Sequence, residues 1–219
     1  MRKTILLFVL LLSSSAFAQN IQLHYDLGKD RDYFTSTIEM FKPDEYGATF
    51  FFFDFDFNNL GNKSISLAYF EIARYITIPG ASGLSATVQY NDGTAPWGPL
   101  GHIVLGGLSY PIDLGFVTLN TDILFRKDYL SNGSGAQLTT VWFVPFLEGK
   151  ITFTGFLDLW TGDYWYTDGT QMVLLTEPQL WYNFDNHISV GSEIEISNNF
   201  LPLTDGIQVN PTVAVKWNF

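Results

Sequence analysis

Cysteine is absent from this 219-residue sequence, and histidine occurs only three times. The absence of cysteine excludes thiolate metal sites, cysteine nucleophiles and disulfide bonds. Positive charge is also scarce. The chain has 11 Lys and Arg but 22 Asp and Glu, which gives a formal net charge of −11. That deficit argues against a nucleic-acid partner, since phosphate binding depends on Lys and Arg. After residue 18, no apolar run reaches the length of a membrane-spanning helix.

Aromatic residues, in contrast, make up 17% of the chain, more than the 15% that are charged. A chain this aromatic without a long apolar helix has two options. It either builds a very large soluble core, or it turns the apolar faces of β-strands toward lipid.

The first 18 residues have the composition of a signal peptide. Arg2 and Lys3 precede an apolar run over residues 5–12, and Ala16-Phe17-Ala18 supplies an A-x-A cleavage site. The run is too short to span a bilayer as a helix, which disfavours a retained anchor. We therefore expect residues 1–18 to be removed and residues 19–219 to form one domain.

Turn-rich breaks divide residues 19–219 into about twelve segments with the character of strands. They are residues 21–27, 32–41, 48–58, 64–78, 84–91, 102–111, 116–129, 137–147, 151–161, 172–184, 188–197 and 207–219. Connections of alternating length separate them, as expected of long outer loops and short periplasmic turns. The sequence predicts an all-β protein, a transmembrane antiparallel β-barrel of about 12 strands with both termini periplasmic.

The last segment shows the alternation most clearly. From Ile207 to Phe219 the odd positions are apolar or proline, and the even positions are polar apart from Ala214. Side chains alternate across a strand, so one face is apolar and the other polar. A strand that ends in Phe resembles the C-terminal insertion signal of bacterial outer-membrane barrels. That resemblance implies the barrel-assembly machinery as a partner, through Phe219, and location in the outer membrane.

Two further features concern the strand ends and the fourth segment. Trp160, Tyr164, Trp165 and Tyr166 lie at a predicted outer end, where amphipathic rings form a girdle. A second group lies at predicted periplasmic ends: Tyr110, Phe146, Tyr182, Phe184, Trp217 and Phe219.

The fourth segment has no clear inner face, and a bulge near Tyr69 and Phe70 is one interpretation. The sixth and eighth segments are equally ambiguous.

Charged side chains on the polar face should point into the barrel, because a charge that faces lipid at mid-depth costs roughly 2–4 kcal/mol. Residues projected inward are Asp26, Glu39, Asp54, Asp56, Asp122, Asp158, Glu177, Glu193 and Glu195, with Arg126 and Lys216 as cations. Aromatic rings lie among them, and rings with nearby carboxylates suit a flat, hydroxylated solute. The candidate substrate-binding residues are Glu39, Phe52, Asp54, Asp56, Asp122, Arg126, Glu193 and Glu195. Alternatively, these charges pair with one another and fill the interior.

Three early segments resemble a known family. They are Asp32-Tyr-Phe-Thr-Ser-Thr-Ile-Glu-Met-Phe41, Pro43-Asp-Glu-Tyr-Gly47 and Phe50-Phe-Phe-Phe-Asp-Phe-Asp-Phe57. These acidic-aromatic strands resemble those of the nucleoside-specific outer-membrane channels, the Tsx-like superfamily, and the chain is similar to an offshoot of it. The resemblance implies a monomeric twelve-stranded barrel whose narrow lumen passes nucleosides. By position, Glu39, Asp54 and Asp56 match the family pattern.

An enzyme is the weaker hypothesis. His187-Ile-Ser189-Val-Gly191 faintly resembles a motif of outer-membrane phospholipase A. Both side chains belong to the polar inner face, however, whereas a lipase needs them outward. Neither a cofactor nor a metal site is expected.

The sequence therefore favours a non-enzymatic outer-membrane channel for passive diffusion of small polar solutes through a narrow acidic-aromatic lumen, and the family resemblance implies nucleosides as the solute. A structural or adhesion barrel with a closed lumen is the alternative, and an outer-membrane lipase is a more distant one. Lipid and a small polar solute are the expected partners besides the assembly machinery.

Overall fold

A computed structural model describes residues 18–58, 64–202, 204 and 206–219. Residues 1–17 of the predicted signal peptide lie outside the described residues. The strands are β1 Ala18–Asp26, β2 Phe34–Asp44, β3 Gly47–Phe57, β4 Leu67–Thr77, β5 Ser85–Ala95, β6 Gly98–Pro99, β7 Ile103–Asp113, β8 Thr118–Asp128, β9 Ser134–Phe146, β10 Ile151–Asp163, β11 Thr170–Thr176, β12 Gln179–Asn183, β13 Ile188–Asn198 and β14 Gln208–Asn218. A 3-10 turn, η1, spans Leu147–Gly149. Among the described residues no helix has the length and apolarity needed to cross a membrane.

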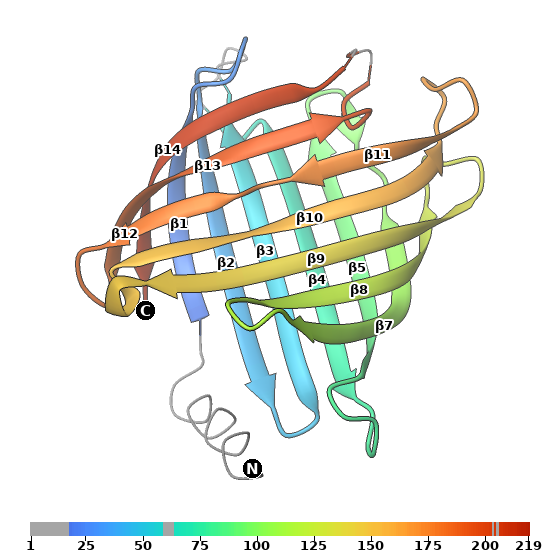
Figure 1. The fold of residues 1–219 in the computed structure, drawn as a ribbon. Helices are drawn as coiled ribbons and strands as arrows, with labels where there is room; N and C mark the ends of the chain where they lie inside the picture. The colour runs from blue at the N-terminus through green and yellow to red at the C-terminus, as the bar shows by residue number, and fades with distance from the viewer. Residues whose placement is uncertain (1–17, 59–63, 203, 205) are drawn as a thin grey trace.

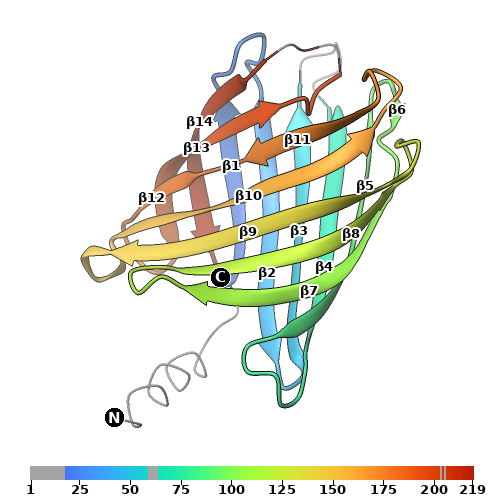
Figure 2. The same ribbon diagram turned by 45° about the vertical axis from the view of Figure 1, so that its right-hand side comes forward.

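The strands form one closed antiparallel barrel (Figures 1 and 2). Apart from β6, β11 and β12, each strand pairs with the strands next to it around the barrel in chain order, and β14 pairs with β1 to close the wall. The two-residue β6 only extends the hairpin at the end of β5. Strands β11 and β12 are one strand interrupted at Glu177 and Pro178, because proline cannot donate a ladder hydrogen bond. The barrel therefore has twelve strands in the described part of the chain, as predicted.

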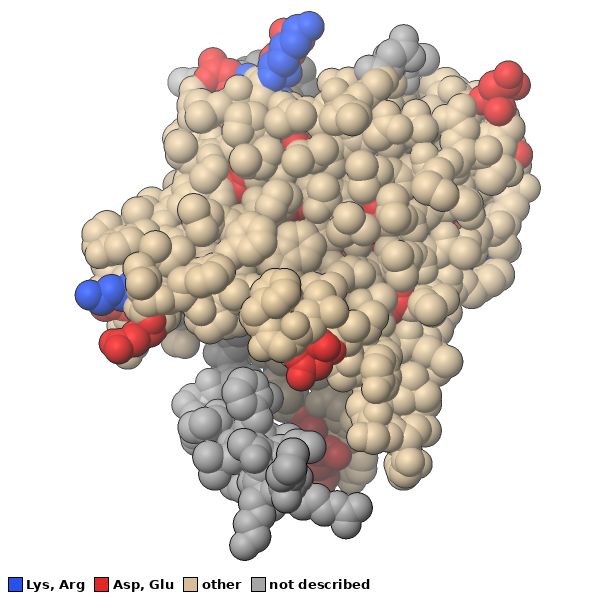
Figure 3. Space-filling model, in the orientation of Figure 1, with Lys and Arg blue, Asp and Glu red and all other residues tan. Residues whose placement is uncertain are grey.

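The alternation of the sequence becomes the two faces of the wall. In β1, Gln22 and His24 are buried inside, while Ile21 and Leu23 are 37% and 42% exposed on the outside. In β8, Asp122 is buried and Ile123 is 69% exposed. Figure 3 shows the result, a lateral surface on which charged side chains gather at the two ends and the broad band between is largely uncharged. An apolar band around a closed barrel is the surface that a bilayer requires.

The barrel has two different rims. The start of β1 and the end of β14 lie at the same rim, because Asn20 pairs with Asn218; we call it the terminal rim. The connections between β2 and β3, β4 and β5, β7 and β8, β9 and β10, and β12 and β13 also lie there. The opposite rim, the loop rim, carries the described connections between β1 and β2, β5 and β7, β8 and β9, and β10 and β11 (Figure 1). Successive connections thus alternate between two distinct rims.

Short side-chain hydrogen bonds fix the turns of the terminal rim. In the turn after β12, the backbone N–H groups of His187 and Ile188 donate to Asp185 Oδ1 at 2.7 and 2.8 Å. These two donors hold the pKa of the Asp185 carboxyl below its usual range, since they favour the ionised form. The turn between β2 and β3 contains only Glu45 and Tyr46.

Strand β4 runs without the bulge that the sequence suggested. Its pairing with β3 keeps one register from Leu67, opposite Asp56, to Ile76, opposite Gly47. Glu71 consequently faces inward, together with Tyr69, while Ile72 is 42% exposed on the outside. The sequence was ambiguous because both faces of this strand carry aromatic or apolar residues.

The aromatic residues predicted at the terminal rim lie at strand ends there. Trp217 and Phe219 pack with ring centroids 4.9 Å apart, and Tyr182 and Phe184 with centroids 5.0 Å apart. At the loop rim the girdle prediction was wrong for Tyr164, which is 5% exposed and turns inward. Trp165 is 70% exposed, and Trp160, which strand parity also places on the inner face, is 6% exposed.

Candidate functional site

All eight candidate residues lie on the inner face of the barrel wall. Each of them either lies opposite another inward-facing residue on the neighbouring strand, or makes a hydrogen bond with an inward-facing side chain. They are Glu39 on β2, Phe52, Asp54 and Asp56 on β3, Asp122 and Arg126 on β8, and Glu193 and Glu195 on β13. The structure distributes them around the lumen in several polar clusters instead of bringing them to one point.

The first cluster is a row across five strands. The register places Asn20, Glu39, Phe52, Glu71 and Asn91 directly opposite one another, from β1 to β5. Asn20 Nδ2 donates to Glu39 Oε1 at 3.1 Å, and Asn91 Nδ2 donates to Glu71 Oε1 at 2.8 Å. Phe52 therefore has a carboxylate on each side, and each carboxylate is held by an amide. We call these five residues the Phe52 row.

Threonines hold the acidic residues that follow Phe52 on β3. Thr37 Oγ1 donates to Asp54 Oδ1 at 2.5 Å, and Thr35 Oγ1 donates to Asp56 Oδ1 at 2.7 Å. Both threonines belong to the inner face of β2, directly opposite their partners. Neutral donors thus orient these carboxylates without cancelling their charge.

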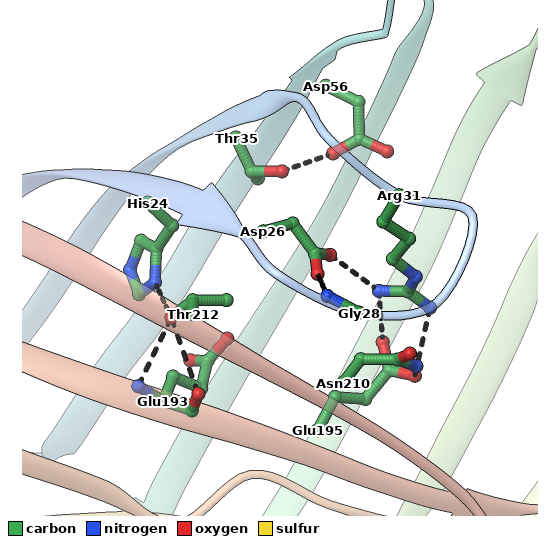
Figure 4. A network of polar contacts seen from close by, with 10 residues as sticks. All are labelled: His24, Asp26, Gly28, Arg31, Thr35, Asp56, Glu193, Glu195, Asn210 and Thr212. Atoms are coloured by element: carbon green, nitrogen blue, oxygen red, sulfur yellow. Dashed lines mark hydrogen bonds and ion pairs between the residues drawn. The ribbon is translucent and has the colours of Figure 1, made fainter.

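A second cluster lies at the loop rim (Figure 4). The connection between β1 and β2 folds inward, and Arg31 Nη1 donates to Asp26 Oδ2 at 3.0 Å. The same guanidinium donates to both carboxylate oxygens of Glu195 at 3.1 Å. Asn210 Nδ2 donates to Glu195 Oε1 at 2.9 Å, and the backbone N–H of Gly28 donates to Asp26 Oδ1 at 2.7 Å.

The third cluster surrounds Arg126. Its Nη1 donates to Gln137 Oε1 at 2.6 Å, and its Nη2 donates to Asp128 Oδ2 at 3.1 Å. The guanidinium carbon lies 4.7 Å from the ring centroid of Trp160. Tyr164 donates its hydroxyl to Asp128 at 3.0 Å. This contact explains why Tyr164 turns inward, since Oδ2 of the buried Asp128 carboxylate gains a second donor.

Two more clusters complete the wall. Asp122 accepts from the Tyr75 hydroxyl at 3.0 Å and from Gln89 Nε2 at 2.9 Å. Across the barrel, Glu193 accepts from Gln179 Nε2 at 2.5 Å. The Lys216 ammonium lies 4.0 Å from the ring centroid of Trp181, a cation–π contact.

Space remains inside the barrel near the terminal rim. Val141 and Phe143 share the parity of Thr139, which lies opposite the inward-facing Asp122. They are nevertheless 40% and 65% exposed. The interior is much tighter along other strands, because Trp181 on β12 is 0% exposed and Leu105 on β7 and Leu124 on β8 are each 1% exposed.

Three charged residues of these clusters were missed by the sequence analysis. Arg31 lies in a connection, where strand parity gives no direction. Glu71 belongs to the strand whose phase was ambiguous. Asp128 shares the parity of Asp122 and Arg126, so the alternation of β8 could have identified it.

Ser189 and His187 do not have the mutual geometry that the lipase hypothesis requires. Ser189 is 0% exposed, and its Oγ donates to Asn183 Oδ1 at 2.6 Å. His187 is exposed, and its Nδ1 contacts the backbone carbonyl of Asn218 at 2.9 Å. The two side chains therefore engage different partners instead of each other.

Residues 18–219 match the model of a family described as a domain of unknown function, DUF5020. The chain belongs to this family. No curated protein sequence matches the DUF5020 chain.

Solved structures with the same fold include two porins and an outer-membrane protein. The "NanC porin" aligns with a TM-score of 0.61 at 13% identity, covering 92% of the DUF5020 chain and 100% of its own. The "KdgM porin" aligns with a TM-score of 0.53 at 11% identity, over 92% and 99% of the two chains. A loop-deletion mutant of OmpT from Vibrio cholerae gives 0.50 at 7% identity, over 93% and 98%. With its apolar outer band, this fold places the DUF5020 protein in a bacterial outer membrane.

Proposed function

We propose that the protein is a channel for passive diffusion of small polar solutes across the outer membrane. The observation that carries the proposal is the inner face of the twelve-stranded barrel, on which carboxylates and rings line a lumen with exposed residues near the terminal rim. A barrel of eight strands has an interior filled by its own side chains, and a barrel of sixteen strands encloses an open pore. A twelve-stranded barrel is intermediate in diameter. A narrow passage follows from that size.

The charge of the inner face defines the expected selectivity. Inward carboxylates such as Glu39, Asp54 and Glu193 outnumber the inward cations, which are Arg31, Arg126 and Lys216 in the described chain. A low-dielectric tube lined by one sign of charge concentrates the opposite sign. The channel accordingly prefers cations, admits neutral solutes and excludes nucleotides through their phosphates.

Nucleosides are the solute class that the Tsx-like resemblance favours within this proposal. Phe52 lies beside Tyr69 with ring centroids 6.0 Å apart, and Glu39 and Asp54 lie nearby on the same face. Rings can stack on a base, and carboxylates can accept hydrogen bonds from ribose hydroxyls. In the same proposal the solute contacts the polar candidate residues, which are Glu39, Asp54, Asp56, Asp122, Arg126, Glu193 and Glu195.

The proposal also includes the setting of the barrel. The terminal rim faces the periplasm, the loop rim faces outward, and Phe219 is read by the barrel-assembly machinery during insertion. The proposed state is a monomer, and the closed antiparallel wall leaves no strand edge for pairing with a second copy.

A closed structural or adhesion barrel is the second candidate. It is favoured by the tight packing around Trp181 and by the Arg31 contacts at the loop rim, both of which fill the interior.

Swelling of proteoliposomes separates the two candidates. Refolded protein should admit uridine and adenosine faster than their monophosphates. A closed barrel would give swelling no faster than empty liposomes for every solute. Uptake of monophosphates at the rate of nucleosides would contradict the proposed selectivity and leave a non-selective channel.

A further inference from the structure

The Phe52 row has a composition that points to a ligand class. Phe52 is partly exposed to the lumen, and its ring lies 6.1 Å from Phe50 and 6.0 Å from Tyr69, centroid to centroid. Glu39 and Glu71 stand on its two sides. An aromatic face attracts a cation through the ring quadrupole, and flanking carboxylates add direct attraction.

Neither carboxylate of the row has a cation of its own. In the described part of the chain, the salt bridges join Arg31 with Asp26 and Glu195, Arg74 with Asp44, and Arg126 with Asp128. Lys216 lies within electrostatic reach of Glu39, and Arg126 within reach of Glu71. Both cations have other partners, since Lys216 packs on Trp181 and Arg126 bonds to Asp128 and Gln137.

Two buried oxygen atoms near Glu71 lack a hydrogen-bond donor. Asn91 is 4% exposed, its Nδ2 donates to Glu71, and its Oδ1 accepts no hydrogen bond from the described residues. Asp158 on β10 lies within electrostatic reach of Glu71, and its Oδ1 is also without a donor there. Buried acceptors are normally satisfied, so these two leave room for donors that the chain does not supply. Glu71 and Asp158 also repel each other when both are ionised. Arg126 is within electrostatic reach of both, but its hydrogen bonds go to Asp128 and Gln137.

We propose that the Phe52 row, with Asp158, is a binding site for small organic cations that carry a primary ammonium group. The alkyl part of the solute packs on Phe52. The ammonium lies between Glu71 and Asp158 and donates its hydrogens to their oxygens and to Asn91 Oδ1.

Other ligand classes fit the site less well. A metal ion needs several oxygen ligands that converge on one point, and no such group of acidic or histidine side chains occurs among the described residues. An anion would meet Glu39, Glu71 and Asp158. A quaternary ammonium could contact the ring but has no N–H to offer to the unsatisfied oxygens.

The inference rests on the proposed function, because a solute reaches the row only through an accessible lumen. Equilibrium binding and conduction are therefore measured separately. Isothermal titration calorimetry of the folded, detergent-solubilised protein uses n-butylammonium, tetramethylammonium and 1-butanol as probes. We expect n-butylammonium to bind more tightly than tetramethylammonium, and 1-butanol to show no saturable binding.

Matched variants locate the site. Glu71→Gln should weaken n-butylammonium binding about tenfold, because it removes one charge that the ammonium contacts. Phe52→Leu should weaken it about fivefold by removing the ring. Phe53→Leu changes the neighbouring outward ring, and Glu148→Gln removes an exposed charge in η1; both controls should bind like the unaltered protein. Slower migration after boiling verifies that each variant is folded.

Each outcome has a defined meaning. Absence of n-butylammonium binding, equal binding of 1-butanol, or unchanged affinity in folded Glu71→Gln would overturn the site. If conductance persists in that case, only this inference fails and the channel stands. Binding without any conductance would sustain the site and overturn the channel.

Discussion

Arg31 and Glu195 are joined by two parallel hydrogen bonds of 3.1 Å, although 164 residues separate them in the sequence. The guanidinium lies in the connection between β1 and β2, and the carboxylate belongs to β13 (Figure 4). A third contact, 3.0 Å to Asp26 Oδ2, fixes the same side chain to the end of β1. The pair therefore fastens a loop-rim connection to β13, which is separated from β1 by β14 alone, and narrows the entrance that the loop rim offers.

Arg31→Ala should destabilise the barrel, because it leaves Asp26, which is 4% exposed, beside Glu195 without a cation. Breaking such a pair costs about 3 kcal/mol. Arg31→Lys should recover only part of the loss, since an ammonium lacks the planar fork of the guanidinium. Equilibrium urea unfolding in detergent, followed by tryptophan fluorescence, measures both. Stability of the alanine variant equal to that of the unaltered protein would show that the contacts contribute nothing.

Adjacent glycines in β7 provide a test of the barrel wall. A Cβ at Gly107 would lie 2.0 Å from the backbone oxygen of Ile123, whereas a Cβ at Gly106 would lie 3.8 Å from the nearest atom, the oxygen of Thr87. Gly107→Ala should therefore lower the unfolding free energy by about 1–3 kcal/mol, the usual effect of overpacking. Gly106→Ala, the matched control, should differ little from the unaltered protein. Equal unfolding midpoints for the two variants would mean that β7 and β8 pair in another register.

Removal of the two β3 carboxylates should change selectivity. Asp54→Asn with Asp56→Asn keeps a hydrogen-bond acceptor for each threonine partner but eliminates two lumen charges. The cation preference, and any nucleoside block of the current, should both weaken. Asp113→Asn with Glu148→Gln, in exposed turns of the terminal rim, is the control with the same change of net charge. Unchanged reversal potentials in the first double variant would place these carboxylates outside the permeation path.

Phe52→Ala should separate stacking from charge. The change removes the ring and leaves every lumen carboxylate in place, so nucleoside block should weaken while the reversal potential stays nearly constant. Phe53→Ala, in which the ring lost is on the outer face, serves as the control. A large change of reversal potential in Phe52→Ala would indicate that the ring orders the carboxylates of the Phe52 row instead of contacting the solute.

Deletion of Phe219 should reduce assembly in cells more than it reduces stability. In the barrel, Phe219 contributes a backbone hydrogen bond to Gln19 at 3.0 Å and a ring contact with Trp217. Refolding into detergent should therefore survive the deletion. The heat-modifiable fraction recovered from outer membranes should fall, and Phe219→Tyr should restore it. Normal assembly of the truncated chain would show that its end is no insertion signal.

Sequence alone predicted the strands because most of them alternate cleanly. In β1, β5 and β8 the polar positions of one parity became the inner face, and the strand limits agree within a few residues. Twelve strands and a closed barrel followed from the same rhythm.

The details that failed have physical reasons. Strand β4 places Tyr69 and Phe70 on opposite faces, so hydrophobicity gives no phase. Tyr164 belongs to an aromatic cluster typical of a membrane girdle, but a hydrogen bond to Asp128 draws it inside. Arg31 depends on a loop conformation and on partners in distant strands, which no local pattern encodes. The candidate inner residues were thus predictable from parity, whereas their grouping into clusters required the register.

Single-channel recording in a planar bilayer with a potassium chloride gradient tests the central claim most directly. Folded protein, verified by its faster migration before boiling, should produce discrete conductance steps, and the reversal potential should have the sign of a cation-preferring pore. Absence of steps from protein shown to be folded and inserted would contradict the channel. Steps with a reversal potential of the opposite sign would contradict the acidic lumen as the determinant of selectivity.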